Sequence, residues 1–322
     1  MNISRTTYSA LARKKRGTSR AATWLGVVLL GAFVLLALIG LLHPSDPNSL
    51  SALGAEAPSW KYPFGTDLLG RDLFVRVSAG AWMSLLVSVG SVLFGLAFAV
   101  PIGVYTAWRH ERWPDQILMR VVEMTQIVPQ FILAIIVLGI VATGDVAFFG
   151  VKISMTTRLI FCIGLGFIPF FTRVTRSAAL VEIEKEYVES LRLIGVPNRE
   201  VLLREVLPNI APVIAIQALL AFAIAVFAEG GLSYLGLGVP PPEPTLGNLI
   251  SEAGSQLVDG AWWYALIPGA VLVAGITGGN LLADNLTSRG TQASLVDNPT
   301  DPLISNYTST EAALNQDEKL PL

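Results

Sequence analysis

The feature that most limits the fold of this 322-residue chain is a set of long stretches without any formal charge. A helix needs about 20 mainly apolar residues to cross the roughly 30 Å hydrocarbon core of a membrane. In hydrocarbon, every backbone N–H and C=O must find its hydrogen-bond partner within the protein, which favours helices. Five stretches meet this requirement, at residues 21–44, 77–108, 124–144, 206–228 and 260–283. The sequence therefore predicts an all-α membrane protein.

A sixth apolar stretch, residues 159–172, is only 14 residues long and lies between Arg158 and Arg173. Its length alone does not separate a membrane span from a buried segment. Long arginine stems can reach the membrane interface, so a span is expected here as well. We predict six spans, at residues 24–42, 84–108, 121–143, 157–176, 210–228 and 262–282.

Basic residues are distributed unequally between the predicted loops. Six precede the first span: Arg5, Arg13, Lys14, Lys15, Arg16 and Arg20. Lysine and arginine concentrate on the cytoplasmic side of membrane proteins, so the N-terminus is expected in the cytoplasm. Six crossings then place the loops 109–120 and 173–204 and the C-terminus there too. The opposite loops hold few basic residues: Lys61, Arg71, Arg76, Lys152 and Arg158.

This topology divides the chain into regions. In chain order they are a basic leader at 1–23, a membrane domain at 24–290 and a polar tail, expected to be disordered, at 291–322. The domain contains outer loops at 43–80 and 231–261 and a cytoplasmic loop at 181–209. A cleavable signal peptide is the alternative for the leader, but the first span exceeds the usual apolar core of such a peptide. The net charge of −2 provides no basic field for nucleic acid.

The cytoplasmic loop contains signals for two short helices. Good helix formers cover residues 186–194, and Gly195 followed by Pro197 is typical of a helix end. A second helix is expected at 199–207, ended by Pro208. Such an exposed helix with a glycine turn is suited to insertion into a groove on a partner. A solvated loop that only joins two spans is the alternative.

The spacing of residues in this loop resembles the EAA loop of ABC importer permeases, whose pattern is EAA, three residues, Gly, nine residues and Ile-x-Leu-Pro. Four fixed positions match: Glu189, Gly195, Leu207 and Pro208. Three depart, since the two alanines and the isoleucine are replaced by Ser190, Leu191 and Glu205. In that family the loop forms a helix that docks in a cleft of the ATPase subunit. The resemblance therefore implies an ATPase-coupling surface made of Tyr187, Glu189, Ser190, Arg192, Gly195 and Val196.

Three further segments resemble C-type subunits of dipeptide/oligopeptide/nickel permeases. They are YPFGTDLLGRDLFVRVSAGAWMSL at 62–85, GLSYLGLGVPPPEPTLGNLI at 231–250 and WWYALIPGAVLVAGITGGNLLADNL at 262–286. Together the resemblance covers roughly residues 24–290. The chain departs from the family at the exit of the last segment, where two glycines and an arginine are replaced by Ala283, Asn285 and Thr287.

The resemblance implies the six-helix type I permease fold of ABC importers, in the bacterial inner membrane, with both termini cytoplasmic. It implies a pore shared with a homologous second permease, two cytoplasmic ATPase subunits or one fused pair, an external solute-binding protein and surrounding lipid. ATP and Mg²⁺ are then expected in the partner subunits, with no cofactor in this chain. Di- or oligopeptides are the expected substrates, and nickel complexes or other small solutes such as glutathione-like molecules are the alternatives.

Polar residues inside the predicted spans are candidates for the translocation pathway, because placing them against lipid is costly. Glu123, Gln126 and Gln130 recur at spacings of three and four, so one continuous helix would place them on one face. Gln217 lies inside the fifth span. Hydrogen bonding between helices, without substrate contact, is the alternative role for each.

The outer segment GTDLLGRD places two aspartates beside arginines. Either Asp67 or Asp72 could pair with Arg71 or Arg76, and the neighbouring glycines permit tight turns. We expect a folded outer loop here rather than a catalytic site. Glu229, within the family pattern E-x-x-L-S-x-L-G-L-G, is likewise expected to be structural.

Other functional classes lack their usual residues. The phosphate-binding pattern G-x-x-x-x-G-K-[ST] is missing because no lysine follows a glycine. A self-sufficient secondary transporter or channel needs charged groups near mid-membrane, and only Glu123 comes near. An intramembrane enzyme needs paired aspartates or a Ser/His set, and His43 and His110 fall on opposite sides of the membrane. We therefore predict a pore-forming subunit that is not itself an enzyme and has no metal site.

Overall fold

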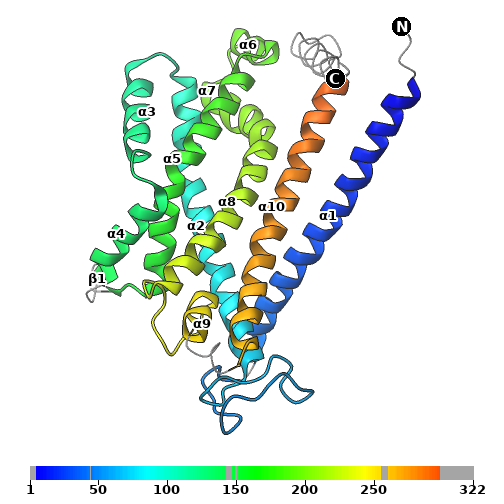
Figure 1. Cartoon of the computed structure of the whole chain (residues 1–322). Helices are drawn as coiled ribbons and strands as arrows, with labels where there is room; N and C mark the ends of the chain where they lie inside the picture. The colour runs from blue at the N-terminus through cyan, green and yellow to red at the C-terminus, as the bar shows by residue number, and fades with distance from the viewer. Residues whose placement is uncertain (1–4, 44, 143–146, 149–150, 255–259, 298–322) are drawn as a thin grey trace, which may run out of the picture.

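The computed structural model describes residues 5–43, 45–142, 147–148, 151–254 and 260–297. The described part is a bundle of long helices with a folded loop region at one end (Figure 1). The helices are α1 (Arg5–Leu42), α2 (Leu73–Trp108), α3 (Trp113–Thr125), α4 (Gln130–Ala142), α5 (Met155–Ile183), α6 (Glu186–Leu193), α7 (Asn198–Glu200), α8 (Leu207–Tyr234), α9 (Leu246–Ala253) and α10 (Trp263–Asp297). Two-residue strands β1 (Ala147–Phe148) and β2 (Val151–Lys152) pair between α4 and α5. Apart from this small hairpin, the all-α prediction is confirmed.

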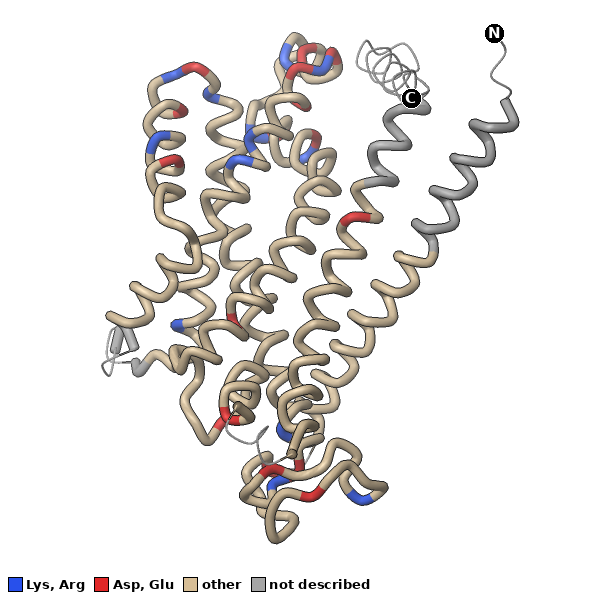
Figure 2. The backbone as a smooth tube through the Cα atoms, in the orientation of Figure 1, with Lys and Arg blue, Asp and Glu red and all other residues tan. Residues whose placement is uncertain are grey.

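The bundle has two ends that differ in content. The α6 end contains α6, the start of α1 and the end of α10 (Figure 1). The α9 end contains α9 and the loop of residues 45–72. Figure 2 shows that charged residues gather at both ends, while the middle of the bundle is largely uncharged. This distribution suits a bundle whose middle lies in hydrocarbon.

Five helical stretches in the described part of the chain are long and apolar enough to cross a membrane. They are Ala21–Leu42, Leu73–Trp108, Met155–Ile183, Asn198–Tyr234 and Trp263–Thr287. Each covers one of the predicted spans to within one residue, including the short fourth span. Five of the six predicted spans are therefore confirmed.

The third predicted span, residues 121–143, is wrong as a continuous helix. α3 ends at Thr125, α4 begins at Gln130, and the two helices are bent by 79° relative to each other. Pro129 explains the break, because it has no backbone N–H to donate and disfavours a helical conformation of the residue before it. The described residues contain up to six spans if this bent pair counts as one. Thr143 itself lies outside the described residues.

α2 begins at Leu73, well before the predicted start of the second span. Residues 73–80 of the predicted outer loop 43–80 are therefore helical. Asp72 starts the helix, because its side chain accepts a hydrogen bond from the backbone N–H of Phe74 at 2.8 Å. Such a cap satisfies a backbone donor that has no partner within the helix.

The second helix predicted in the loop 181–209 does not end at Pro208. The chain stays helical from Asn198 through α7, a π-helical segment at Val201–Val206, and α8. In a regular α-helix, the proline ring clashes with the carbonyl group four residues earlier. That carbonyl group belongs to the π-helical segment, whose wider turn has a different hydrogen-bond pattern, so the helix continues.

Three predicted boundaries shift because helices run further than expected. α1 begins at Arg5, inside the leader. α8 runs to Tyr234, and α9 forms inside the predicted loop 231–261. α10 runs to Asp297, inside the predicted tail. Residues 298–322 lie outside the described residues, so disorder in the rest of the tail stays a prediction.

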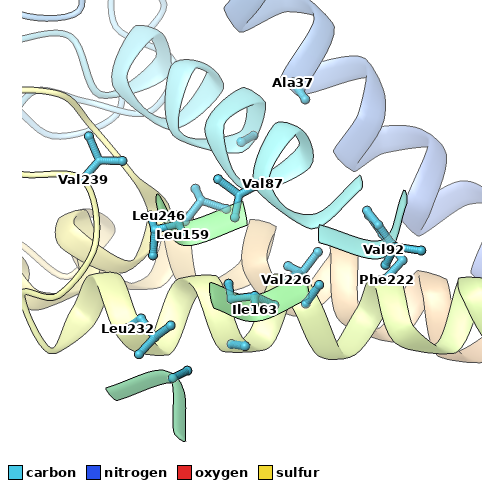
Figure 3. Packing of buried hydrophobic residues seen from close by; sticks show 14 of the residues in the cluster. Ala37, Val87, Val92, Leu159, Ile163, Phe222, Val226, Leu232, Val239 and Leu246 are labelled. Carbon is cyan, nitrogen blue, oxygen red and sulfur yellow. The ribbon is translucent and has the colours of Figure 1, made fainter. Parts of the chain in front are cut away.

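Close packing between α2 and α5 depends on small residues. Gly95, Ala99 and Gly103 recur at every fourth position of α2 and are buried. A Cβ atom at Gly103 would lie 2.9 Å from the carbonyl oxygen of Thr172 on α5. Small residues let helices approach closely in membranes, where packing rather than hydrophobic exclusion holds them together. Apolar side chains of α2, α5, α8 and α9 fill the surrounding interior, among them Val87, Leu159, Ile163, Val226, Leu232 and Leu246 (Figure 3).

The crossing of α1 and α2 gives a test of this packing. A Cβ atom at Gly40 would lie 2.1 Å from the carbonyl oxygen of Ser78. We predict that Gly40→Ala lowers the stability by about 1–3 kcal/mol, the usual cost of overpacking, and lowers the melting temperature in detergent. Gly31→Ala on the same helix is the control, because no described atom lies within 4 Å of that Cβ position. Equal melting temperatures for the two variants would contradict the described crossing.

Candidate functional site

α6 is a short helix at the α6 end, between α5 and the helical segment that leads into α8 (Figure 1). One side of α6 is buried, since Val188 has no exposed surface. Val188 belongs to an apolar cluster with residues of α2, α5, the π-helical segment and the start of α8, namely Val104, Ala107, Ala179, Val201, Val206, Ile210 and Ile214. The helix predicted at residues 186–194 is confirmed to within one residue.

A polar cluster holds α6 to both neighbouring helices. Tyr187 donates a hydrogen bond of 2.8 Å to Oε1 of Glu182, at the end of α5. The side-chain amide of Asn209, near the start of α8, donates to the same oxygen and to Oη of Tyr187, both at 3.1 Å. Burial and donation to Glu182 raise the pKa of Tyr187, so the phenol stays a neutral donor at neutral pH. Tyr187, a predicted coupling residue, thus lies on the inner side of α6.

Gly195 ends α6 in the left-handed conformation, with a φ of +85°. The N–H of Gly195 bonds to the C=O of Arg192, and the N–H of Val196 bonds to the C=O of Leu191, each at 3.1 Å. This pair of bonds is the Schellman arrangement, which favours glycine at the first position after the cap. The predicted glycine stop is therefore confirmed. No described atom lies within 4 Å of a Cβ built at Gly195, so the turn faces open space.

The outer side of α6 combines polar and apolar side chains. The predicted coupling residues Glu189, Ser190 and Arg192 are exposed. Next to them, Leu193 and Ile194 are 82% and 76% exposed. Sequence reasoning missed this pair, although two adjacent apolar residues at the end of a polar helix were a usable signal. An apolar pair exposed among charged residues is the kind of surface that a partner protein covers.

The structure separates the predicted pathway residues that were expected on one helix face. Glu123 lies on α3, Gln126 follows its end, and Gln130 begins α4 beyond the 79° bend. The shared face is therefore wrong, because α3 and α4 are not one helix. Oε2 of Glu123 lies 3.5 Å from Nη1 of Arg120, and both side chains are exposed.

A cavity of about 340 Å³ lies at the break, between α3, α4 and α5. Gln126 and Gln130 line it together with apolar side chains such as Leu133. The amide of Gln130 donates to the carbonyl oxygen of Ile163 on α5 at 3.4 Å. Gln217 lies on α8 and does not line this cavity. A mainly apolar cavity with a few amide groups can hold a small solute and orient it.

At the α9 end, Asp67 organises the outer loop. Its carboxylate is 1% exposed and accepts the side-chain Nε–H of Arg71 at 2.5 Å. It also accepts the backbone N–H groups of Leu69 and Arg71, both at 2.9 Å. Of the pairings left open by the sequence, those of Asp67 with Arg71 and with Arg76 form, whereas Asp72 caps α2.

Arg76 extends this cluster to the helices. It is 1% exposed, and its Nε lies 3.8 Å from Oδ2 of Asp67. Its Nη2 lies 3.5 Å from Oε2 of Glu252 on α9. Tyr264 of α10 donates to the same Glu252 oxygen at 2.6 Å. The network therefore joins the outer loop, α2, α9 and α10, and sequence reasoning missed Glu252 and Tyr264.

Glu229 is fully buried on α8. Its carboxylate accepts hydrogen bonds from the hydroxyl groups of Ser84 on α2 and Ser233 one turn further along α8. This contact links α8 to α2, as a structural role requires. In the part of the chain that the structure describes, no group of three or more His, Cys, Asp or Glu side chains could hold a metal ion.

Comparison with known proteins assigns the chain. The family model described as "binding-protein-dependent transport system inner membrane component" matches residues 99–291. The chain belongs to this family. It is a multi-pass membrane permease component of an ABC transport system, and the matched region contains α6, Gly195 and the break between α3 and α4.

Curated relatives of this permease include transport proteins from two bacterial genera. A putative peptide permease protein of Brucella suis is 35% identical over 83% of this chain and 85% of that protein. A putative peptide transport system permease protein of the same organism is 33% identical over 84% of this chain and 88% of that protein. The di/tripeptide transport system permease protein DppC of Pseudomonas aeruginosa is 30% identical over 71% of this chain and 73% of that protein. A solved structure of the MetNI methionine ABC transporter in inward-facing conformations is 18% identical, with a TM-score of 0.48 over 64% of this chain and 94% of that chain.

The buried network at the α9 end of the permease gives a matched pair of variants. Asp67→Asn removes the carboxylate shared by Arg71 and Arg76, and we predict a loss of about 3 kcal/mol. That figure is at the low end for a broken buried ion pair, because Glu252 stays near both arginines. Asp72→Asn should change little, because asparagine caps a helix as well as aspartate does. Thermal unfolding in detergent measures both, and equal stabilities would contradict the network.

Proposed function

We propose that this permease forms the membrane pathway of an ATP-driven importer for di- or oligopeptides, and that separate ATPase subunits drive it through α6. The observation that carries the proposal is the exposed pair Leu193 and Ile194 beside Gly195, at the tip of a helix fixed to α5 and α8. A short helix with an apolar tip fits a groove on a partner protein. The residue spacing shared with the EAA loop supports the same role.

The contacts that hold α6 in place explain how a force applied to it reaches the membrane helices. Val188 and the cluster around Glu182 attach α6 to α5 and to the start of α8. A push on the tip therefore reaches two membrane helices together. Closure of the ATPase pair tilts these helices and opens the pathway toward the α9 end, and hydrolysis resets it, which is alternating access. ATP and Mg²⁺ bind in the partner subunits, and ATP hydrolysis supplies the energy for this cycle.

The two ends of the bundle suit different partners in this proposal. The α6 end faces the cytoplasm, with the start of α1 and the end of α10 on the same side (Figure 1). Two ATPase subunits, or one fused pair, dock there. An external solute-binding protein docks at the α9 end, where the charged network keeps the loop folded. A homologous second permease completes the pore.

Peptides are the substrate class that the relatives favour. The Brucella suis and Pseudomonas aeruginosa relatives are named for peptide transport. The amide side chains of Gln126 and Gln130 at the cavity can donate to and accept from a peptide group. Nickel complexes and other small solutes are the competing substrates within the same class of transporter.

The substrate is tested on the complex of the permease with its partner subunits in liposomes. We expect ATP hydrolysis to rise when the binding protein is supplied with a di- or tripeptide, and not with a nickel complex. The permease alone is expected to show neither ATP hydrolysis nor uptake driven by an ion gradient. Uptake by the permease alone would show that the protein is a secondary transporter and not part of an ATP-driven importer. Stimulation by the nickel complex only would show that the substrate is a nickel complex and not a peptide.

The coupling role of α6 is tested at its glycine turn. Gly195→Arg puts a long charged side chain beside the apolar tip, in a conformation that costs a non-glycine residue about 1–2 kcal/mol. We predict that membrane insertion survives and that substrate-stimulated ATP hydrolysis is lost. Gly260→Arg is the control, because Gly260 has the same φ of +85° and an equally open Cβ position at the α9 end. Normal stimulation in Gly195→Arg would refute docking at α6.

A further inference from the structure

Trp108, the last residue of α2, connects α6 to the turn between α2 and α3. The guanidinium carbon of Arg192 on α6 lies 4.2 Å from the centre of the Trp108 ring. A guanidinium group over an aromatic face is attracted by the negative charge of that face. Arg192 is also the residue whose carbonyl group accepts the N–H of Gly195. The contact therefore reaches the base of the α6 tip.

Asp115, in the first turn of α3, fixes the shape of the same turn. Arg176 on α5 donates to both of its oxygens, from Nε to Oδ1 at 2.9 Å and from Nη2 to Oδ2 at 2.8 Å. The backbone N–H of Glu111, a non-glycine residue with a φ of +63°, donates to Oδ2 at 3.3 Å. His110 Nδ1 lies 3.4 Å from the same oxygen. A two-pronged arginine–carboxylate pair fixes direction as well as distance, so the turn is held against α5.

α3 has little else to hold its base. Of its 13 residues, only Asp115 and Val122 are buried. α3 leads directly into the break at residues 126–129, and Gln126 in that break lies on the wall of the cavity together with Gln130, the first residue of α4. A displacement of Asp115 therefore displaces one wall of the cavity.

We propose that the turn between α2 and α3, held between Arg192 and the Asp115–Arg176 pair, transmits the movement of α6 to α3 and so to the cavity at the helix break. The inference rests on the proposed function, in which the ATPase pushes on α6. It adds α3 to the two membrane helices that α6 moves directly. Trp108, Asp115 and Arg176 are positioning residues, since they act on the pathway through α3.

The first test uses Asp115→Asn and Trp108→Leu in the complete complex in liposomes. Asp115→Asn removes the negative charge and one of the two acceptor oxygens that Arg176 uses, and Trp108→Leu removes the aromatic face beneath Arg192. Neither variant replaces a residue of the α6 tip. We expect basal ATP hydrolysis and assembly with the ATPase subunits to stay unchanged. The number of ATP molecules hydrolysed per substrate transported should rise by about fivefold or more, the low end of measured coupling between sites. An unchanged ratio in both variants would overturn the inference.

Two further variants separate transmission from local stability. Glu200→Gln makes the same acid-to-amide change at the same end and breaks the ion pair with Arg204, and it should keep the normal ratio. The double variant Asp115→Arg with Arg176→Asp exchanges the charges of the pair and should restore the ratio toward normal. An equal rise in Glu200→Gln, or no rescue in the double variant, counts against transmission through this turn.

A distance measurement covers the case in which a variant folds poorly. Spin labels at Ile117 on α3 and Glu186 on α6 would lie on two exposed positions. In the normal complex, the distance between the labels should stay nearly constant between the nucleotide-free and ATP-trapped states, because α3 follows α6. A large change would overturn the inference. The proposed function fails on other results, namely normal stimulation in Gly195→Arg, uptake by the permease alone or stimulation by the nickel complex only, so the two failures are distinct.

Discussion

In the hydrocarbon core no water is available to a free backbone N–H or C=O, so each crossing segment must satisfy these groups internally. This constraint accounts for the long helices and for the gathering of most charged residues at the two ends of the permease (Figure 2). The same constraint explains where a membrane helix can be interrupted. The interruption between α3 and α4 lies against α5, where the side chain of Gln130 bonds to the carbonyl oxygen of Ile163.

Uncharged length was sufficient to locate four of the confirmed spans, because a charge in lipid is costly wherever it falls. The short fourth span also required the long side chains of its flanking arginines, which can reach the membrane interface. It was not sufficient for the third span, which breaks at Pro129. Prolines also lie inside the continuous helices α2, α5 and α10, at Pro101, Pro169 and Pro268. A proline therefore shows where a helix can bend, and packing against neighbouring helices determines whether it does. The sequence contains no local record of that packing.

In the candidate site, too, some features could be predicted from the sequence and others could not. Gly195 predicted the end of α6, because a left-handed turn has a strong residue preference. The contacts that fix α6 join residues far apart in the chain, such as Glu182 and Asn209, and follow no local pattern. The pair of Arg76 and Glu252 is separated by 176 positions. Such pairings depend on which helices become neighbours, and a single sequence does not contain that information.

The charged network at the α9 end has a mechanical consequence. It clamps four segments of the chain together, whereas at the opposite end α3 has only two buried residues and the tip of α6 is free. Segments joined in this way move as one body when any of them is displaced. The 36 residues of α2 span about 54 Å, so a tilt of roughly 10° about one end of this helix carries its other end through about 9 Å. The joined segments keep their positions relative to one another during such a tilt, so the folded loop travels with the helix ends as a single unit.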